Sequence, residues 1–393
     1  MKRIAVLGGG PAGAFAAERL AASGLETVLL DEKLAWEKPC GGGLTYKAYR
    51  EYPFLIDNDK PKKIVWDTYL SEPKAGSVKM KLTHPLVIYS RFDLNRMLLE
   101  RAERAGAQLE KTRVLEMARG ASRWRIRTSG GVIDADFCIV ATGARNSLRQ
   151  VGTQWTRNDT MFALGYYVPS MQEHIDIQFL PKLEGYIWVF PRCGHLSVGI
   201  CGKGESAQSL RKRLEDYMRL RCISWQNAAF YSHVLPSLAT PAWKTNHIAG
   251  DGWLAVGDAA GLVDPITGEG LYYAMRSGDL ASRILVEERH PGSAMTAAYR
   301  TVLHRDFAAD LAFSATFARR VFVGRFLFGT VPARMIQFMR RSPRFHDLMQ
   351  DLFAGTQPYS DLKGRLLRNL NGTLHEVVMN FFFGRLVTGE NKI

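Results

Sequence analysis

The sequence is poor in cysteine, and its cysteines are scattered. None of the five forms a CxxC pair or a Cys/His cluster with zinc-like spacing, so we predict no disulfide framework, no metal site and a reducing compartment. No stretch reaches the roughly 18 unbroken apolar residues of a membrane-spanning helix. The first residues, MKRIAVLGGGPAG, lead directly into a strand and a glycine turn. We therefore expect no secretory signal and a cytoplasmic location.

Acidic residues are also scarce, and in one region they are missing. The net charge is +14, which favours an anionic partner such as nucleic acid, a membrane surface or a phosphorylated substrate, or else reflects a generally basic surface. Between Asp310 and Asp347 no acidic residue occurs, while seven arginines alternate with aromatic and apolar residues. This mixture is typical of a surface that meets anionic headgroups and lipid tails, or of an amphipathic helix whose aromatics fill a core. We expect a monomer, no nucleic acid partner, and peripheral contact with the inner face of a membrane.

The first thirty residues carry the pattern of a dinucleotide site. An apolar strand over residues 4–7 is followed by glycines at GxGxxG spacing, a helix, a second strand and an acid. The glycines allow a tight turn, close approach of a pyrophosphate and close helix packing, while the helix N-terminus faces the phosphates. Asp31 is the expected ribose acid, with Glu32 as the alternative. The predicted nucleotide-binding residues here are Gly8, Gly10, Pro11, Ala12, Gly13, Asp31 and Glu32.

Three further segments accompany this site. Arg91 precedes a helix that we expect to be capped by Asp93. A hairpin turning at Gly130 and Gly131 leads into a strand that ends at Thr142 and Gly143. A buried strand over residues 253–256 then delivers Gly257 and Asp258 into a loop, and Gly268, Glu269, Gly270 and Leu271 open a second helix.

Together these segments resemble the p-hydroxybenzoate hydroxylase-like class of FAD-dependent oxidoreductases. The resemblance implies that Asp258 contacts the ribityl and pyrophosphate part of FAD, and that the helix opened by residues 268–271 faces the flavin pyrimidine ring. Arg91, Thr142, Gly143 and Gly257 inherit FAD-binding positions. Where the class usually has Ala-Asp-Gly, this chain has Ala-Thr-Gly at 141–143. The electron donor therefore stays open between NAD(P)H and ferredoxin, and the single GxGxxG means that a nicotinamide would visit only transiently.

The segment 174–201 reads as β-structure with an aromatic face. Within it Tyr186, Trp188 and Phe190 point to one side of a strand while Ile187 and Val189 point to the other. The alternation predicts either the wall of an apolar site or an ordinary core.

Two motifs decide between these readings by resemblance. GYIWVFPRCGHLSVG and KPCGGGL resemble the YxWxFP and PCGGG motifs of the geranylgeranyl reductase family, and residues 351–367 resemble its C-terminal helical segment. The resemblance implies hydrogenation of isolated alkenes in prenyl chains by hydride transfer from reduced FAD. It places Tyr186, Trp188, Phe190 and Pro191 at the substrate. Gly41, Gly42 and Gly43 are expected to be bare backbone that allows close approach to the flavin and the alkene, with Cys40 as a small cofactor-contacting residue near the reacting carbon. Cys40, Tyr186 and Trp188 are the catalytic candidates, with Cys40, Tyr186 or water as the proton donor.

We expect an α/β fold in which a Rossmann-like FAD-binding domain (1–55, 88–150 and 240–295) is interleaved with an antiparallel β-sheet substrate domain (56–87 and 151–239). A C-terminal helical segment covers 296–393. The alternative functions are a monooxygenase or halogenase-like enzyme on the same scaffold, and a non-catalytic carrier of prenyl lipids. The halogenase motif WxWxIP is replaced here by YIWVFP, which argues against halogenation.

Overall fold

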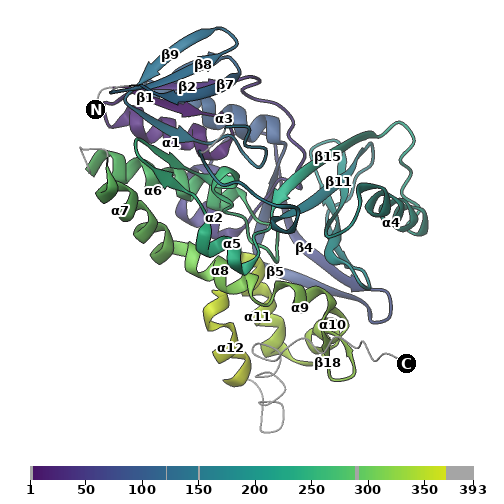
Figure 1. The fold of residues 1–393 in the computed structure, drawn as a ribbon. Coiled ribbons are helices and arrows are strands. Elements are labelled where there is room, and N and C mark those ends of the chain that lie inside the picture. Colours follow the sequence, from purple (N-terminus) through teal and green to yellow (C-terminus); the bar gives the residue numbers. More distant parts are fainter. Residues whose placement is uncertain (1–2, 121, 149–150, 288–291, 369–393) are drawn as a thin grey trace.

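A computed structural model describes residues 3–120, 122–148, 151–287 and 292–368 (Figure 1). Its first layer is a six-stranded sheet in the order β16-β17-β10-β1-β2-β6, parallel except for the β16/β17 pair. The strands are β1 (Arg3–Leu7), β2 (Glu26–Asp31), β6 (Gln108–Lys111), β10 (Phe137–Val140), β16 (Ala249–Gly250) and β17 (Trp253–Ala255). Because β1 and β10 are central, their apolar residues are almost completely buried.

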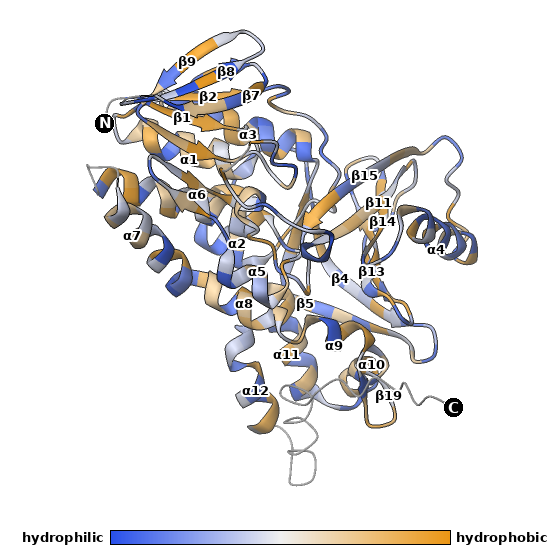
Figure 2. Cartoon of the chain, viewed as in Figure 1, coloured by the Kyte–Doolittle hydropathy of each residue, from blue (hydrophilic) through white to orange (hydrophobic). Residues whose placement is uncertain are grey.

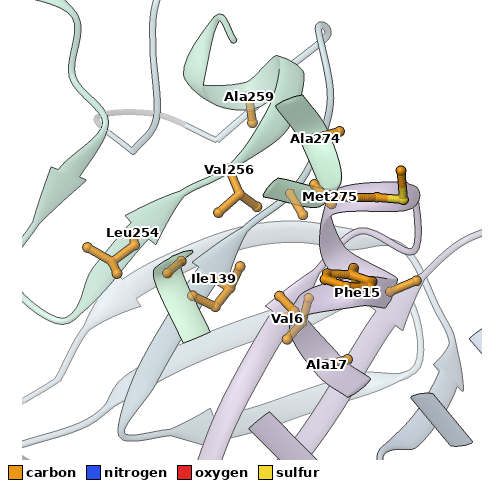
Figure 3. Close-up of a cluster of buried hydrophobic side chains, with 14 of the residues drawn as sticks. Val6, Phe15, Ala17, Ile139, Leu254, Val256, Ala259, Ala274 and Met275 are labelled. Atoms are coloured by element: carbon orange, nitrogen blue, oxygen red, sulfur yellow. The ribbon is translucent and has the colours of Figure 1, made fainter. Parts of the chain in front are cut away.

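Helix α1 (Pro11–Ala22) packs against this sheet and contacts both α3 (Arg91–Arg104) and α6 (Leu271–Glu287). Figure 3 shows the resulting core, where Val6 and Ile139 of the sheet meet Phe15 of α1 and Met275 of α6. A three-stranded sheet of β7 (Val114–Arg119), β8 (Trp124–Thr128) and β9 (Gly131–Ala135) lies across the sheet from α1 (Figure 1). This arrangement brings the carboxyl ends of β1, β10 and β17 together at one edge.

The second layer is an eight-stranded sheet in the order β15-β11-β14-β13-β12-β4-β5-β3. Neighbours are antiparallel except for β12 and β4. One face is covered by α4 (Ala207–Leu220), whose Leu210 and Leu214 pack with Ile187 and Val189. The strands are β3 (Gly43–Leu44), β4 (Lys62–Glu72), β5 (Gly76–Tyr89), β11 (Thr160–Val168), β12 (Ile175–Phe179), β13 (Glu184–Pro191), β14 (Leu196–Lys203) and β15 (Ala229–Pro236).

The C-terminal part contains the helices α7 (Ser293–Leu303), α8 (Ala309–Ala315), α9 (Ala318–Val323), α10 (Val331–Arg341), α11 (Pro343–Ala354) and α12 (Tyr359–Arg368). It begins with α7, which lies along α6, and leads to helices α9 to α12 at the bottom of Figure 1, where α10 and α11 contact β4 and β5. A short hairpin of β18 (Arg325–Phe326) and β19 (Gly329–Thr330) separates α9 from α10. The basic and aromatic stretch is thus not one amphipathic helix, and residues 369–393 of the predicted segment lie outside the described part. None of the described helices is long and apolar enough to cross a membrane.

Two short helices complete the fold, α2 (Tyr46–Glu51) and α5 (Thr240–Thr245). Figure 2 shows that β1 is apolar, whereas helices such as α4 and α7 carry both hydrophilic and hydrophobic residues. The expectation that Asp93 caps α3 is wrong. Ser90 is the N-cap, and its Oγ accepts from the Asp93 backbone N–H at 3.2 Å, so Asp93 supplies only a negative charge in the first turn. The predicted division of the chain into domains stays a prediction, and β3 joins the large sheet by pairing with β5.

Candidate active site

A cavity of about 980 Å³ lies between the two sheets and the C-terminal helices. It extends from the glycine loop after β1 to apolar side chains of α9 through α12. Most of the residues predicted for the site line it: Gly8, Gly10, Pro11, Ala12, Asp31, Glu32, Cys40, Gly41, Gly42, Gly43, Arg91, Thr142, Gly143, Tyr186, Trp188, Phe190, Asp258, Gly268, Glu269, Gly270 and Leu271. Gly13, Pro191 and Gly257 are not among the lining residues. Segments far apart in sequence therefore meet around one space.

The three glycines after β1 have different surroundings. A Cβ on Gly8 would lie 2.3 Å from the Ala141 carbonyl oxygen, and one on Gly13 would lie 1.9 Å from the Gly8 carbonyl oxygen. Gly8 also has φ +118°, which a residue with a side chain rarely adopts. A Cβ on Gly10 would meet no atom within 4 Å, because Gly10 faces the cavity. No side chain caps α1 at this end, so its first backbone N–H groups are available to an anion.

Asp31 is tied into the chain more tightly than its predicted role requires. Its carboxylate accepts from the backbone N–H groups of Gly9 at 2.7 Å, Lys33 at 2.8 Å and Leu34 at 2.6 Å. It still lines the cavity, and two carboxylate oxygens have lone pairs for further donors. Glu32 instead lies 4.0 Å from Arg113 in an exposed ion pair. Contact of either acid with a ribose remains a prediction.

The glycines of the 38–44 loop make room for the protein's own side chains. A Cβ on Gly41 would lie 2.9 Å from the Phe190 ring, and one on Gly43 would lie 3.1 Å from the same ring. Gly42 has φ +81°, and its Cβ would lie 2.2 Å from the Tyr89 carbonyl oxygen. The tight packing at these three positions is internal, and because all three glycines also line the cavity, their contact with the flavin and the alkene remains a prediction.

A buried arginine that the sequence interpretation missed anchors this loop. The Arg192 side chain is completely buried and donates to the carbonyl oxygens of Tyr89 at 2.5 Å and Cys40 at 2.6 Å. It also lies 3.2 Å from a Glu37 carboxylate oxygen. Burial alone would raise the pKa of Glu37, but Arg192 and the N–H and O–H donors of residues 90–92 hold it below its usual value.

The polar end of the cavity carries more positive than negative charge. Lys38 Nζ lies 3.1 Å from the Asp258 carboxylate, and Arg91 and Arg145 also line this end. Burial alone would raise the pKa of Asp258, but the Lys38 cation holds it below its usual value. Burial, with Lys38 beside it, lowers the pKa of His233 to about 3, so this imidazole is neutral.

These groups fit the phosphates of a dinucleotide. Among the described residues, Arg91 Nε and His233 Nε2 are buried without a hydrogen-bond partner, and both residues line the cavity. Buried polar atoms of this kind normally have a hydrogen-bond partner. Together with the free N-terminus of α1, they match the anionic part of FAD.

The aromatic face of β13 forms a wall of the same cavity. Tyr186 and Trp188 have ring centroids 6.2 Å apart, and Tyr186 stacks on Phe322 of α9 at 6.4 Å. The Tyr186 hydroxyl donates to the Thr267 carbonyl oxygen, and burial raises its pKa well above the usual value. Trp188 Nε1 lies 3.4 Å from Ser197 Oγ. The phenol proton is thus held within the protein, which weakens Tyr186 as a proton donor.

The wall continues into the basic and aromatic stretch. Phe322, Phe326 and Phe338 of that stretch line the cavity together with Phe345 and Leu348. The alternation of basic and aromatic residues in this stretch therefore arises in part because some of its aromatic residues face the protein interior, as the alternative to membrane contact anticipated.

Comparison with known proteins agrees with this architecture. Residues 2–153 match the pyridine nucleotide-disulphide oxidoreductase family. The chain is 27% identical to the geranylgeranyl diphosphate reductase of Arabidopsis thaliana, with 75% of this chain and 67% of that protein covered. It is also 27% identical to the menaquinone reductase of Mycobacterium tuberculosis, with 72% and 76% covered.

The fold is shared with solved structures. A geranylgeranyl bacteriochlorophyll reductase-like protein from Thermoplasma acidophilum superimposes with a TM-score of 0.75 at 20% identity, covering 94% of this chain and all of that one. A flavin-dependent brominase superimposes with a TM-score of 0.67 at 16% identity, covering 93% and 98%. The fold and the family matches define an FAD-dependent oxidoreductase. The predicted relationship with geranylgeranyl reductases is confirmed.

Proposed function

We propose that this protein is an FAD-dependent reductase that hydrogenates C=C bonds of a prenyl chain carried by a lipid or a phosphate. The observation that carries the proposal is the continuity of the cavity. Its polar end has the glycine loop, Lys38 and Asp258, and its other end is walled by aromatic and aliphatic side chains. A long apolar chain fits such a space with one segment beside the cofactor.

The residues divide the chemistry in the following way. FAD, when bound, supplies the hydride. Tyr186 and Trp188 line the apolar part of the cavity. An aromatic ring whose face meets a developing positive charge stabilises it by about 0.5–2 kcal/mol. Alkene carbons also need positioning and exclusion of water, which the packed wall provides. Cys40 lines the cavity, and its Sγ accepts from the Gly42 backbone N–H at 3.3 Å.

The proposal is tested by anaerobic turnover with geranylgeranyl diphosphate, a prenylated phospholipid and menaquinone, using NADPH, NADH or reduced ferredoxin as the donor. We expect at least one substrate to gain hydrogen at a prenyl double bond. Trp188→Ala should reduce turnover at least ten-fold while the flavin spectrum stays unchanged. Fast reoxidation of the flavin by oxygen with formation of a hydroxylated or halogenated product would instead support the oxygenase alternative.

We further propose that the β18–β19 hairpin brings the protein to an anionic membrane, where prenyl lipids lie. Phe328 at its tip is 98% exposed. Leu327 and Phe328 both have positive φ, at 45° and 62°, which non-glycine residues seldom adopt. Arg334 holds this turn by donating to the carbonyl oxygens of Phe326 and Leu327. A fixed exposed aromatic beside several arginines suits a surface of acyl chains and anionic headgroups.

Sedimentation with vesicles tests this contact. Phe328→Asp should weaken binding to phosphatidylglycerol vesicles about 10- to 150-fold, because one buried phenyl ring contributes about 1.5–3 kcal/mol. Leu220→Asp is the matched control, since Leu220 is 78% exposed at the end of α4, away from the hairpin (Figure 1). Equal binding of both variants would contradict the assignment.

A further inference from the structure

A hydrogen bond across the cavity joins two loops that lie 224 positions apart in sequence. Thr45 Oγ1, just before α2, donates to Glu269 Oε1 at 2.9 Å. Both residues line the cavity, and Glu269 lies two positions before α6. The neighbouring Gly268 is beside the aromatic wall, because a Cβ there would lie 3.1 Å from the Tyr186 hydroxyl. Glu269 therefore stands at the border between the polar and the apolar parts of the cavity.

Ionisable groups from several elements surround this carboxyl. Lys47 of α2 is the nearby cation, and its Nζ lies 4.5 Å from the Tyr272 ring and 5.1 Å from the Tyr273 ring. Asp264 comes from the same loop as Glu269, and its carboxylate accepts from the Tyr359 hydroxyl at 2.8 Å. The charged and titratable groups that interact with Glu269 or Lys47 are Asp264, Tyr272, Tyr273, Asp306, Asp310 and Tyr359.

The surroundings set how readily this carboxyl holds a proton. Burial raises the pKa of Glu269 to about 7, with the negative charge of Asp264 acting in the same direction. The Thr45 hydrogen bond and the Lys47 charge both act to lower it. Burial also lowers the pKa of Lys47, although the surrounding acids oppose that change. A carboxyl poised in this way suits general acid and base chemistry near neutral pH.

The proposed reaction needs such a group. Reduction of one C=C bond forms two C–H bonds. One uses the hydride that FAD would supply after its reduction by a nicotinamide or by ferredoxin, and the other uses a proton. That proton must come from water, across a wall that is largely apolar. The Tyr186 hydroxyl is committed to the Thr267 carbonyl oxygen, which leaves the wall itself without a ready donor.

We propose that Glu269, hydrogen-bonded by Thr45 and flanked by Lys47, is the proton-holding site of this cavity. It takes up one proton from solvent and releases one proton into the cavity for each double bond reduced. The inference rests on the proposed function and deepens it. The sequence predicts Glu269 only as a cofactor-binding residue, and the proposal adds a role in proton transfer.

Infrared titration of the oxidised holoenzyme is the first test, because it requires no substrate. The wild type should show a protonated carboxyl band that disappears with a midpoint near pH 7, and Glu269→Gln should lack it. Thr45→Val and Lys47→Met should each move the midpoint to higher pH, since each removes an interaction that favours the carboxylate. If Glu269 were only structural, Glu269→Gln would have lower thermal stability, but no carboxyl band would titrate near pH 7 and shift in Thr45→Val and Lys47→Met.

The midpoint potential of bound FAD is the second test. Its pH dependence should change slope near pH 7 in the wild type and not in Glu269→Gln, because a nearby proton is taken up as negative charge is added. With a prenyl substrate that the wild type reduces, Glu269→Gln should be about 100- to 10,000-fold slower, with no break near pH 7. Glu269→Asp should restore part of the rate.

Three outcomes would overturn the inference. They are a wild-type titration that survives in Glu269→Gln, a midpoint that Thr45→Val and Lys47→Met leave in place, and wild-type turnover by Glu269→Gln. Failure of the proposed function is distinguishable, because it would appear as a wild type that reduces no prenyl substrate. In that event the infrared and potential measurements still decide whether Glu269 exchanges a proton coupled to flavin reduction.

Discussion

Replacing Arg192 with Met tests whether the anchor of the 38–44 loop is needed for cofactor binding. Met has similar length and no charge, so the substitution removes the fork of donors while filling much of the same volume. The Tyr89 carbonyl oxygen loses the Arg192 donor, the Cys40 carbonyl oxygen keeps only Ser197 Oγ at 3.3 Å, and Glu37 loses its buried cation. Glu37 retains Ser90 Oγ and the backbone N–H groups of residues 91 and 92 as donors.

The expected loss follows from these contacts. A buried acceptor left without a donor costs about 1–3 kcal/mol, and breaking a buried charge pair costs about 3–5 kcal/mol. Because the Glu37 side chain is 31% exposed, water recovers part of the second cost. We therefore expect Arg192→Met to lower the free energy of unfolding by about 3–4 kcal/mol.

Urea unfolding and FAD titration measure the two consequences. The variant should unfold at lower urea concentration and bind FAD at least ten-fold more weakly, because the loop beside Phe190 loses its anchor. Arg213→Met is the control, since Arg213 makes a more exposed pair with Glu205. The stability contributed by Glu37 is present above its unfolded pKa and is lost as the pH falls through its lowered folded pKa, so the difference between wild type and variant should narrow in acid. A loss below about 1 kcal/mol, with unchanged FAD affinity, would refute the reasoning.

Three further predictions concern single side chains. Gly10→Val should abolish FAD retention while the apoprotein keeps its thermal stability, because a Cβ there meets only the cavity; a fully flavin-loaded variant would remove the pyrophosphate assignment. Turnover of Cys40→Ala and Cys40→Ser, measured at constant FAD content, tests whether the Cys40 thiol donates the proton. Unchanged rates in both variants would mean that Cys40 only packs. Glu269→Gln should gain stability relative to wild type as the pH rises from 5 to 8 in urea titrations. The raised folded pKa means that the native state holds this proton longer than the unfolded state, so wild-type stability falls across that interval, and parallel curves would contradict the shift.

Local patterns made much of this fold predictable. The glycine spacing before Pro11 and the alternation of Tyr186 with Ile187 are properties of neighbouring residues, and they translate directly into a turn and into the two faces of a strand. The aromatic side of β13 indeed lines the cavity, and the opposite side packs on α4.

Contacts between distant segments were not predictable in the same way. Arg192 meets Cys40 from 152 positions away, and Thr45 meets Glu269 from 224 positions away. No periodicity records such pairs, because each depends on how the two sheets are placed. The N-cap of α3 was also not predictable from the sequence pattern. Ser90 and Asp93 are both good capping residues, and the path of the backbone decides between them.

The most direct test of the central claim is mass spectrometry of a prenyl substrate after anaerobic incubation with the FAD-loaded protein and an electron donor. A prenyl reductase should add two hydrogens for each double bond reduced, and this gain should be lost in Gly10→Val and strongly reduced in Trp188→Ala. An unchanged prenyl chain with every donor, or a product carrying oxygen or halogen in place of the added hydrogens, would contradict this claim.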